Sequence, residues 1–233
     1  MKRLALLAAF AVAISPAAAQ AGTITLAGWN SSYTGNLTNN GSTSNNITLG
    51  SANMQNPGGG LEAYVPNTFE AYCVDLANTT GGNPHTVDVP PSLMSAWNLE
   101  GAPSAGGVVA SWLYNTYAAS IGIANDNLKR AALALSIWEV LYDSNYNLTN
   151  DNAGTGFKAT ADAAVMTQAA TYLQNAQNAV TAGQDAYWLK LSNANRDTQD
   201  FIGPRVVPEP ASMLLLGLGL VGAAGAARRR SSK

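Results

Sequence analysis

The chain has 233 residues, of which 47% are hydrophobic and only 11% are charged, and its net charge is −2. Six of the 12 Lys and Arg residues lie in the two terminal segments. Residues 22–210 therefore contain six basic and all 14 acidic side chains, and they carry a net charge of −8. An acidic body without a basic patch disfavours nucleic acid as a partner.

Residues 1–21 have the pattern of a secretory signal peptide. A basic start precedes an apolar core from Leu4 to Ile14, and Ala19 and Ala21 provide small residues at the cleavage positions. Eleven apolar residues are too few to cross the hydrocarbon core of a bilayer as a permanent anchor. We therefore expect a signal helix that is removed, and a mature chain that starts near residue 22.

The first part of the expected mature chain, residues 22–60, is rich in Asn, Ser, Thr and Gly. Thr23 to Trp29 and Asn45 to Gly50 alternate polar and apolar residues, which is typical of half-buried strands. Asn and Gly clusters between them indicate turns. The pattern predicts edge strands joined by long loops, although the same composition also occurs in disordered leaders.

Further strands and three helices follow in chain order. Strands are predicted over Phe69–Leu76, which contains Cys73, and over Thr86–Val89. Helical spacing of apolar residues predicts helices over 105–122, over 126–143 and over 160–181, followed by strands over 186–192 and 199–203. This order favours an α+β fold, in which a small β-sheet, sandwich or barrel packs with a three-helix subdomain.

The second predicted helix carries the clearest pattern. Asn125 or Asp126 is placed to cap its start. Polar Lys129, Arg130 and Glu139 fall off its apolar stripe, which consists of Leu128, Ala131, Leu135, Trp138 and Tyr142. We expect Trp112 of the first helix, Trp138 and Tyr142 to lie in the core.

The C-terminal segment combines an apolar run with a basic end. Ala211 to Ala227 holds seventeen uncharged residues, which as a helix extend about 25 Å, the short end of what crosses a core of about 30 Å. Arg228, Arg229 and Arg230 follow and would hold the end on the cytoplasmic side. A single transmembrane helix is predicted here, with the acidic domain outside.

The whole tail resembles the PEP-CTERM sorting signal of Gram-negative bacteria. The resemblance rests on the motif Val207, Pro208, Glu209 and Pro210, the apolar run and the arginine cluster, in that order. It implies a membrane-embedded exosortase-type transpeptidase as partner and only transient residence in the inner membrane. It also implies processing near the motif and delivery to the cell surface or extracellular matrix, where exopolysaccharide is a further expected partner. The chain then divides into a signal peptide (1–21), an ectodomain (22–203) and a sorting tail (204–233).

The ectodomain resembles, more distantly, the thioester domains of bacterial adhesins. The stretches that carry this likeness are "AYCVDL" around Cys73 and "ALALSIWEVLYD" around Trp138. In those adhesins a strand cysteine is joined to a glutamine four residues before the tryptophan, and the thioester acylates surface amines. Here that position is Ala134, which has no carboxamide, so the resemblance implies a kept scaffold and lost chemistry.

Other chemistry has little support in the sequence. The single Cys and the single His exclude an intramolecular disulfide and a self-contained zinc site, and no spaced acidic run indicates calcium. We expect no cofactor, no metal and no enzymatic activity. A cysteine hydrolase remains an alternative, with Cys73 as nucleophile, His85 as base and Asp75 or Asp88 as its orienting group. Against this alternative, His85 falls in a turn-rich segment where we expect it to be exposed, and we expect Cys73 to be buried and inert.

The preferred prediction is therefore a non-catalytic surface or matrix protein with a structural or adhesive role. A covalent adhesin that uses Cys73 is one alternative. A glycan-binding module is another, with exposed Trp29, Trp97 or Tyr33 as stacking platforms.

Overall fold

The computed structural model describes residues 20–97, 106–143, 145–150, 156–178, 185–193 and 196–206. Most of the predicted signal helix, the predicted transmembrane helix and the motif residues 207–210 lie outside these ranges. None of the helices in the described ranges is both long and apolar enough to span a bilayer.

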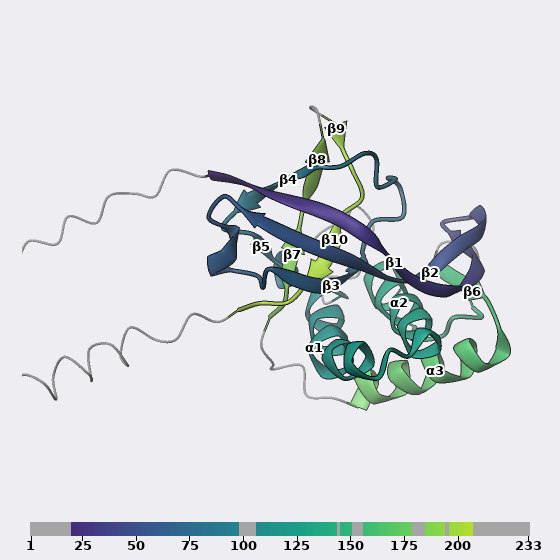
Figure 1. Ribbon diagram of the computed structural model, residues 1–233. Helices are drawn as coiled ribbons and strands as arrows, with labels where there is room; N and C mark the ends of the chain where they lie inside the picture. The colour runs from purple at the N-terminus through teal and green to yellow at the C-terminus, as the bar shows by residue number, and fades with distance from the viewer. Residues whose placement is uncertain are drawn as a thin grey trace, which may run out of the picture.

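A long antiparallel hairpin forms the centre of the sheet (Figure 1). Its strands β1 (Gln20–Asn39) and β2 (Ser42–Gly58) have 20 and 17 residues and pair from Thr23↔Gly58 to Asn39↔Ser42. The prediction of edge strands with long loops was therefore wrong. Asn40 and Gly41 both have positive φ, of 48° and 77°, and join the strands by a two-residue turn. Asn-Gly is the pair that such turns favour, because both central residues must adopt left-handed backbone conformations.

The remaining strands extend the sheet on both sides of this hairpin. The pairing order is β5-β7-β10-β3-β2-β1-β4-β8-β9, with β6 also paired to β1, and each pair is antiparallel. The path among the described residues ends at β5 and β9 and does not close on itself. The bounds are β3 Thr68–Cys73, β4 His85–Val89, β5 Ser92–Leu93, β6 Phe157–Thr160, β7 Tyr187–Leu189, β8 Leu191–Asn193, β9 Arg196–Asp197 and β10 Phe201–Gly203.

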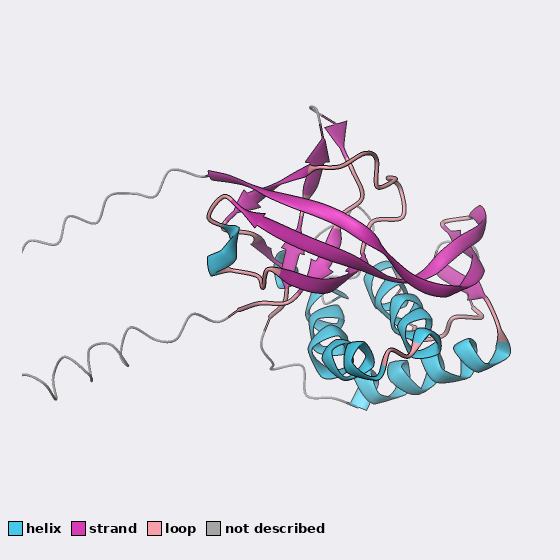
Figure 2. Cartoon of the chain, in the orientation of Figure 1, coloured by secondary structure: helices cyan, strands magenta, loops and turns pink. Residues whose placement is uncertain are grey.

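Three helices cover one face of the sheet (Figure 2). They are α1 (Gly106–Ala124), α2 (Asn127–Tyr142) and α3 (Ala163–Asn178), and two short 3₁₀ turns lie at Leu61–Ala63 and Met94–Ala96. The predicted α+β class and its three helices are confirmed, while the sheet is larger than the small sheet that was expected.

Helix α2 lies at the centre of this packing. Its cap is Asp126, whose carboxylate accepts a hydrogen bond from the Lys129 N–H at 3.1 Å. It contacts β1 and β2 on one side and α1 and α3 on the other, so nearly its whole circumference is enclosed. Arg130 and Glu139, which the pattern placed off the apolar stripe, are consequently buried, at 2% and 0% exposure.

Both ends of the described chain lie on the same side of the molecule (Figure 1). The start of β1 pairs with the end of β2, immediately before the turn at Leu61–Ala63. Val206 donates its N–H to the Tyr64 carbonyl at 2.8 Å, directly after the same turn. The segments that lead to the two terminal regions therefore leave the domain close together.

Candidate functional site

Cys73 is held inside the core at the end of β3. It is 5% exposed, and it lies opposite Phe201 of β10. Tyr142 of α2 binds the backbone just after Cys73. The Tyr142 hydroxyl donates to the Val74 carbonyl and accepts from the Leu76 N–H, each at 3.0 Å. Tyr142 thus holds together the strand and the helix that carry the two stretches.

The helix position that holds glutamine in that resemblance offers no acyl donor. Ala134 is 1% exposed and belongs to the same hydrophobic core as Cys73. Gln199 lies just beyond the end of this strand, where its Nε2 donates to the Asp75 carbonyl at 2.9 Å. That hydrogen bond holds the Gln199 carboxamide, and the loss of thioester chemistry stays a prediction.

Cys73 is expected to be unreactive in the folded protein. Burial, and secondarily the charge of Asp75, raise the pKa of its thiol far above the ordinary range, and the thiolate is the reactive form. Iodoacetamide at neutral pH should leave the native protein unlabelled and should label it fully in denaturant, as intact mass reports. Rapid labelling of the native protein would contradict this burial.

The hydrolase alternative finds no support in the positions of its residues. His85, expected to be exposed, is only 1% exposed, and it lies on β4, which pairs with β1 and β8. Its Nδ1 lies 3.3 Å from the Thr198 hydroxyl, and burial lowers its pKa. Asp75 accepts from the Ala77 N–H at 2.7 Å and from the Asn78 amide at 2.5 Å. Within the described residues, these hydrogen bonds do not link Cys73 to His85.

The predicted stacking platforms do not form one surface. Trp29 of β1 is 39% exposed and Tyr33 is half-buried. Trp97 is 4% exposed and packs edge-on against Tyr142 at 5.6 Å between ring centres, so its predicted exposure was wrong. Its position after the second 3₁₀ turn places the ring in the core instead of at the surface.

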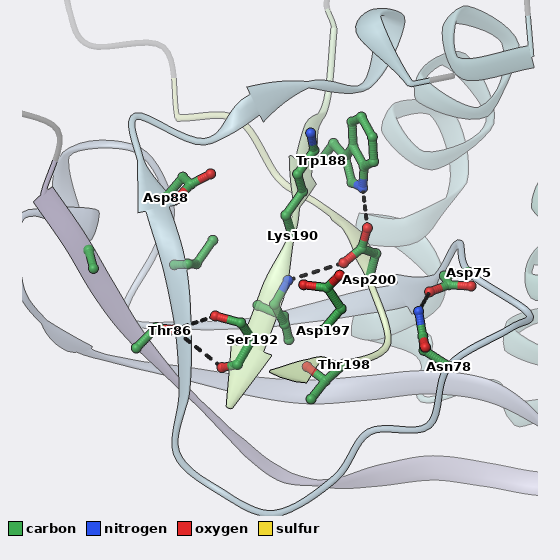
Figure 3. A pocket seen from close by; sticks show the side chains of 13 residues that line it. Asp75, Asn78, Thr86, Asp88, Trp188, Lys190, Ser192, Asp197, Thr198 and Asp200 are labelled. Carbon is green, nitrogen blue, oxygen red and sulfur yellow. Dashed lines mark hydrogen bonds between the residues drawn. The ribbon is translucent and has the colours of Figure 1, made fainter. Parts of the chain in front are cut away.

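A polar pocket of about 410 Å³ lies beside β4 and β8 (Figure 3). It is formed where β4, β7 and β8 meet the loop after β3 and the segment before β10. Most of its lining can form hydrogen bonds, and its polar or aromatic members are Asp75, Asn78, Thr86, Asp88, Trp188, Lys190, Ser192, Asp197, Thr198 and Asp200.

Asp200 binds two neighbouring residues that line this pocket, Trp188 and Leu191. One carboxylate oxygen accepts from Trp188 Nε1 at 2.8 Å and the other accepts from the Leu191 N–H at 3.1 Å. Burial raises the pKa of Asp200 to about 6. The Lys190 ammonium lies 3.9 Å from the centre of the Trp188 ring, so it covers one face of the indole.

A second pocket adjoins the first. It has a volume of about 480 Å³ and shares Asn78, Asp197 and Thr198 with the first pocket. We call the two adjoining pockets together the polar trough, which lies along β8, β9 and the loop over residues 77–82. Within the described ranges, no three His, Cys, Asp or Glu side chains gather closely enough to hold a metal ion.

No local sequence signal indicates this trough. Its residues come from segments that are far apart in the chain, and none of them forms a spaced motif. Only the strand order, which places β8 beside β4, brings them together.

Asp200 is expected to make stability depend on pH. Its folded-state pKa of about 6 lies above the ordinary value of 3.8, so protonation favours the folded state. The contribution of Asp200 to the free energy of unfolding is complete below pH 3.8 and is lost as the pH rises through about 6. The free energy of unfolding of the wild type should therefore fall, relative to that of Asp200→Asn, between about pH 4 and pH 7. Asp88→Asn, which changes an exposed carboxylate of the same pocket, is the control, and a constant difference for Asp200→Asn would contradict the expectation.

The sorting residues lie mostly beyond the described part of the chain. Ala19, Val207 to Pro210 and Arg228 to Arg230 fall outside it, whereas Ala21 lies in β1 opposite Asp88. Residues 206–230 match the family model of the PEP-CTERM protein-sorting motif. No curated protein and no solved structure matched the chain. The motif implies export, membrane-associated sorting and an exosortase as the processing partner, and it supports the identification of this chain as a PEP-CTERM protein.

Proposed function

We propose that this protein is a non-catalytic component of the cell surface or extracellular matrix, released from the inner membrane by exosortase processing and associated with exopolysaccharide. The match of residues 206–230 to the sorting motif carries this proposal. The acidic body and the common side on which both chain ends leave the domain agree with a domain held outside a membrane during sorting.

The environment of Cys73 supports a role without covalent chemistry. The thiol is buried, its pKa is raised, and the position of the adhesin glutamine holds Ala134. Attachment by a Cys73 thioester would require another carboxamide at the thiol, and Gln199 is engaged with the Asp75 carbonyl. We therefore favour noncovalent association of the protein with the cell surface or matrix.

The polar trough is the surface best suited to a polysaccharide. Hydroxyl, amide and carboxylate groups along both pockets can exchange hydrogen bonds with the hydroxyls of successive sugar residues. Four aspartates face a single lysine in the first pocket, so the site favours a neutral or amine-bearing polymer over an acidic one. Because Lys190 covers one face of Trp188, recognition there would rest on hydrogen bonds more than on stacking.

A retention assay on polysaccharides tests this proposal. Wild-type protein released from its native envelope should be retained by neutral or amine-bearing polymers and not by acidic ones. The double variant Asn78→Ala, Asp197→Ala removes two exposed groups shared by both pockets, and its retention should fall several-fold. Glu62→Gln changes an exposed acid outside the trough and should behave like the wild type. Equal retention of the double variant would exclude the trough, and protein confined to the cytoplasm would exclude the proposed function itself.

A further inference from the structure

A buried carboxylate near the end of α2 has one oxygen without a hydrogen-bond partner among the described residues. Glu139 is 0% exposed, and its Oε1 accepts from the Asn147 N–H at 2.8 Å. Its Oε2 is buried and accepts no hydrogen bond from the part of the chain that the structure describes. A buried acid with an unsatisfied oxygen is costly, so such a group in a folded protein calls for an explanation.

The surroundings of Glu139 add negative charge. Asp143, one helical turn further on, is 4% exposed, and its charge contributes to raising the pKa of Glu139 to about 8, after burial as the main cause. The last turn of α2 contains no basic residue, although the C-terminal end of a helix favours cations. Two acidic side chains and the negative end of a helix dipole thus meet within one turn.

The loop that follows contributes one carboxylate oxygen and one amide oxygen near this point. Asp143 Oδ1 accepts from the Asn145 N–H at 3.0 Å, and Asn145 Oδ1 accepts from the Asn147 N–H at 2.6 Å. Each of these oxygens has a second lone pair. The Asn147 N–H that binds Asn145 also binds Glu139, so the unsatisfied oxygen of Glu139 and the Asn145 amide oxygen belong to one small cluster.

We propose that Glu139, Asp143 and Asn145 form a calcium site, completed by backbone carbonyls of the 145–150 loop and by water. Carboxylate, amide and carbonyl oxygens in an irregular loop are the ligands that calcium accepts, whereas magnesium requires a stricter octahedron. A divalent cation would satisfy Oε2 of Glu139 and offset the repulsion between the two carboxylates. With only two charged ligands, the dissociation constant should lie at about 0.1–1 mM, as in extracellular modules. This site is independent of the polar trough and of the proposed function.

Calorimetric titration of the purified full-length protein with calcium chloride tests the site. The wild type should bind one calcium ion and should unfold at a higher temperature in millimolar calcium. Glu139→Gln keeps the shape of the side chain and removes its charge, and it should weaken calcium binding by about tenfold or more. Glu62→Gln, which removes the same charge from an exposed position, should bind calcium as the wild type does.

Terbium luminescence gives a second measurement that does not depend on the folding of a variant. Terbium bound in this loop should be excited through Tyr146, which neighbours Asn145, and calcium should displace it. If Glu139 is only a buried protonated acid, calcium and terbium will not bind the wild type, and calcium will not change the unfolding temperature of the wild type or of Glu139→Gln. That result would overturn the proposal, as would a Glu139→Gln protein that is folded and binds calcium with wild-type affinity.

Discussion

Replacement of Pro208, Glu209 and Pro210 by alanine is expected to leave the protein in the inner membrane with its C-terminal tail uncleaved. The motif implies recognition by an exosortase, and the three residues are its most distinctive part. Without processing, the apolar run over 211–227 would keep the chain in the bilayer, because at this length it is near what a membrane span requires. Fractionation followed by immunoblotting should show nearly all of the protein moved from the released to the membrane fraction.

The matched control changes residues just beyond the motif. Ser231→Ala together with Ser232→Ala lies after the matched region, which ends at residue 230, and should be sorted like the wild type. Release of the alanine-substituted motif variant at the wild-type level would show that the exosortase does not recognise the tail through these residues.

Arg130→Ala should lower the free energy of unfolding by about 3–5 kcal/mol, because it leaves an inward-facing carboxylate without its cation. The guanidinium binds Glu70 through two hydrogen bonds, Nε to Oε2 at 2.9 Å and Nη2 to Oε1 at 2.6 Å. Its Nη1 also donates to the side-chain oxygens of Asn125 and Asn127 at 2.9 and 3.0 Å. The Arg130 side chain is 2% exposed and that of Glu70 is 19% exposed, so water can replace little of what the substitution removes.

The neighbouring ion pair provides the control for this substitution. Lys129 and Asp126 lie 3.0 Å apart at the surface, with side chains 45% and 30% exposed. Lys129→Ala should lower the free energy of unfolding by less than about 1 kcal/mol, because exposed pairs contribute little. Urea unfolding of both variants measures the difference. An Arg130→Ala protein as stable as Lys129→Ala would show that the pair with Glu70 does not hold α2 to the sheet.

The regular elements with strong local patterns could be predicted from the sequence. Asp126 caps α2, as its position before an apolar stripe indicated, and Trp138 lies in the core. The long hairpin was missed because its Asn, Ser and Thr residues resemble loop composition. Asn40-Gly41 was the local signal that would have predicted its turn.

The buried polar groups could not be predicted from local spacing. Glu70 meets Arg130 across sixty positions of sequence, and His85 is buried on β4, which pairs with strands from both ends of the chain. The helical pattern placed Arg130 and Glu139 off the apolar stripe, and it does not reveal that α2 is enclosed on both sides. The trough was hidden for the same reason, since it exists only once β4 and β8 pair.

The intact mass of the mature protein, taken from its native envelope, decides whether the chain is exported, processed at both ends and unmodified at Cys73. An exported and sorted protein with an unreacted thiol should lack the signal peptide and the segment after the Pro208–Pro210 motif. Its remaining mass should equal that of the unmodified sequence. A mass lower by one ammonia, with no such deficit in Cys73→Ala, would establish a thioester, and a mass that retains both terminal segments would contradict export and sorting.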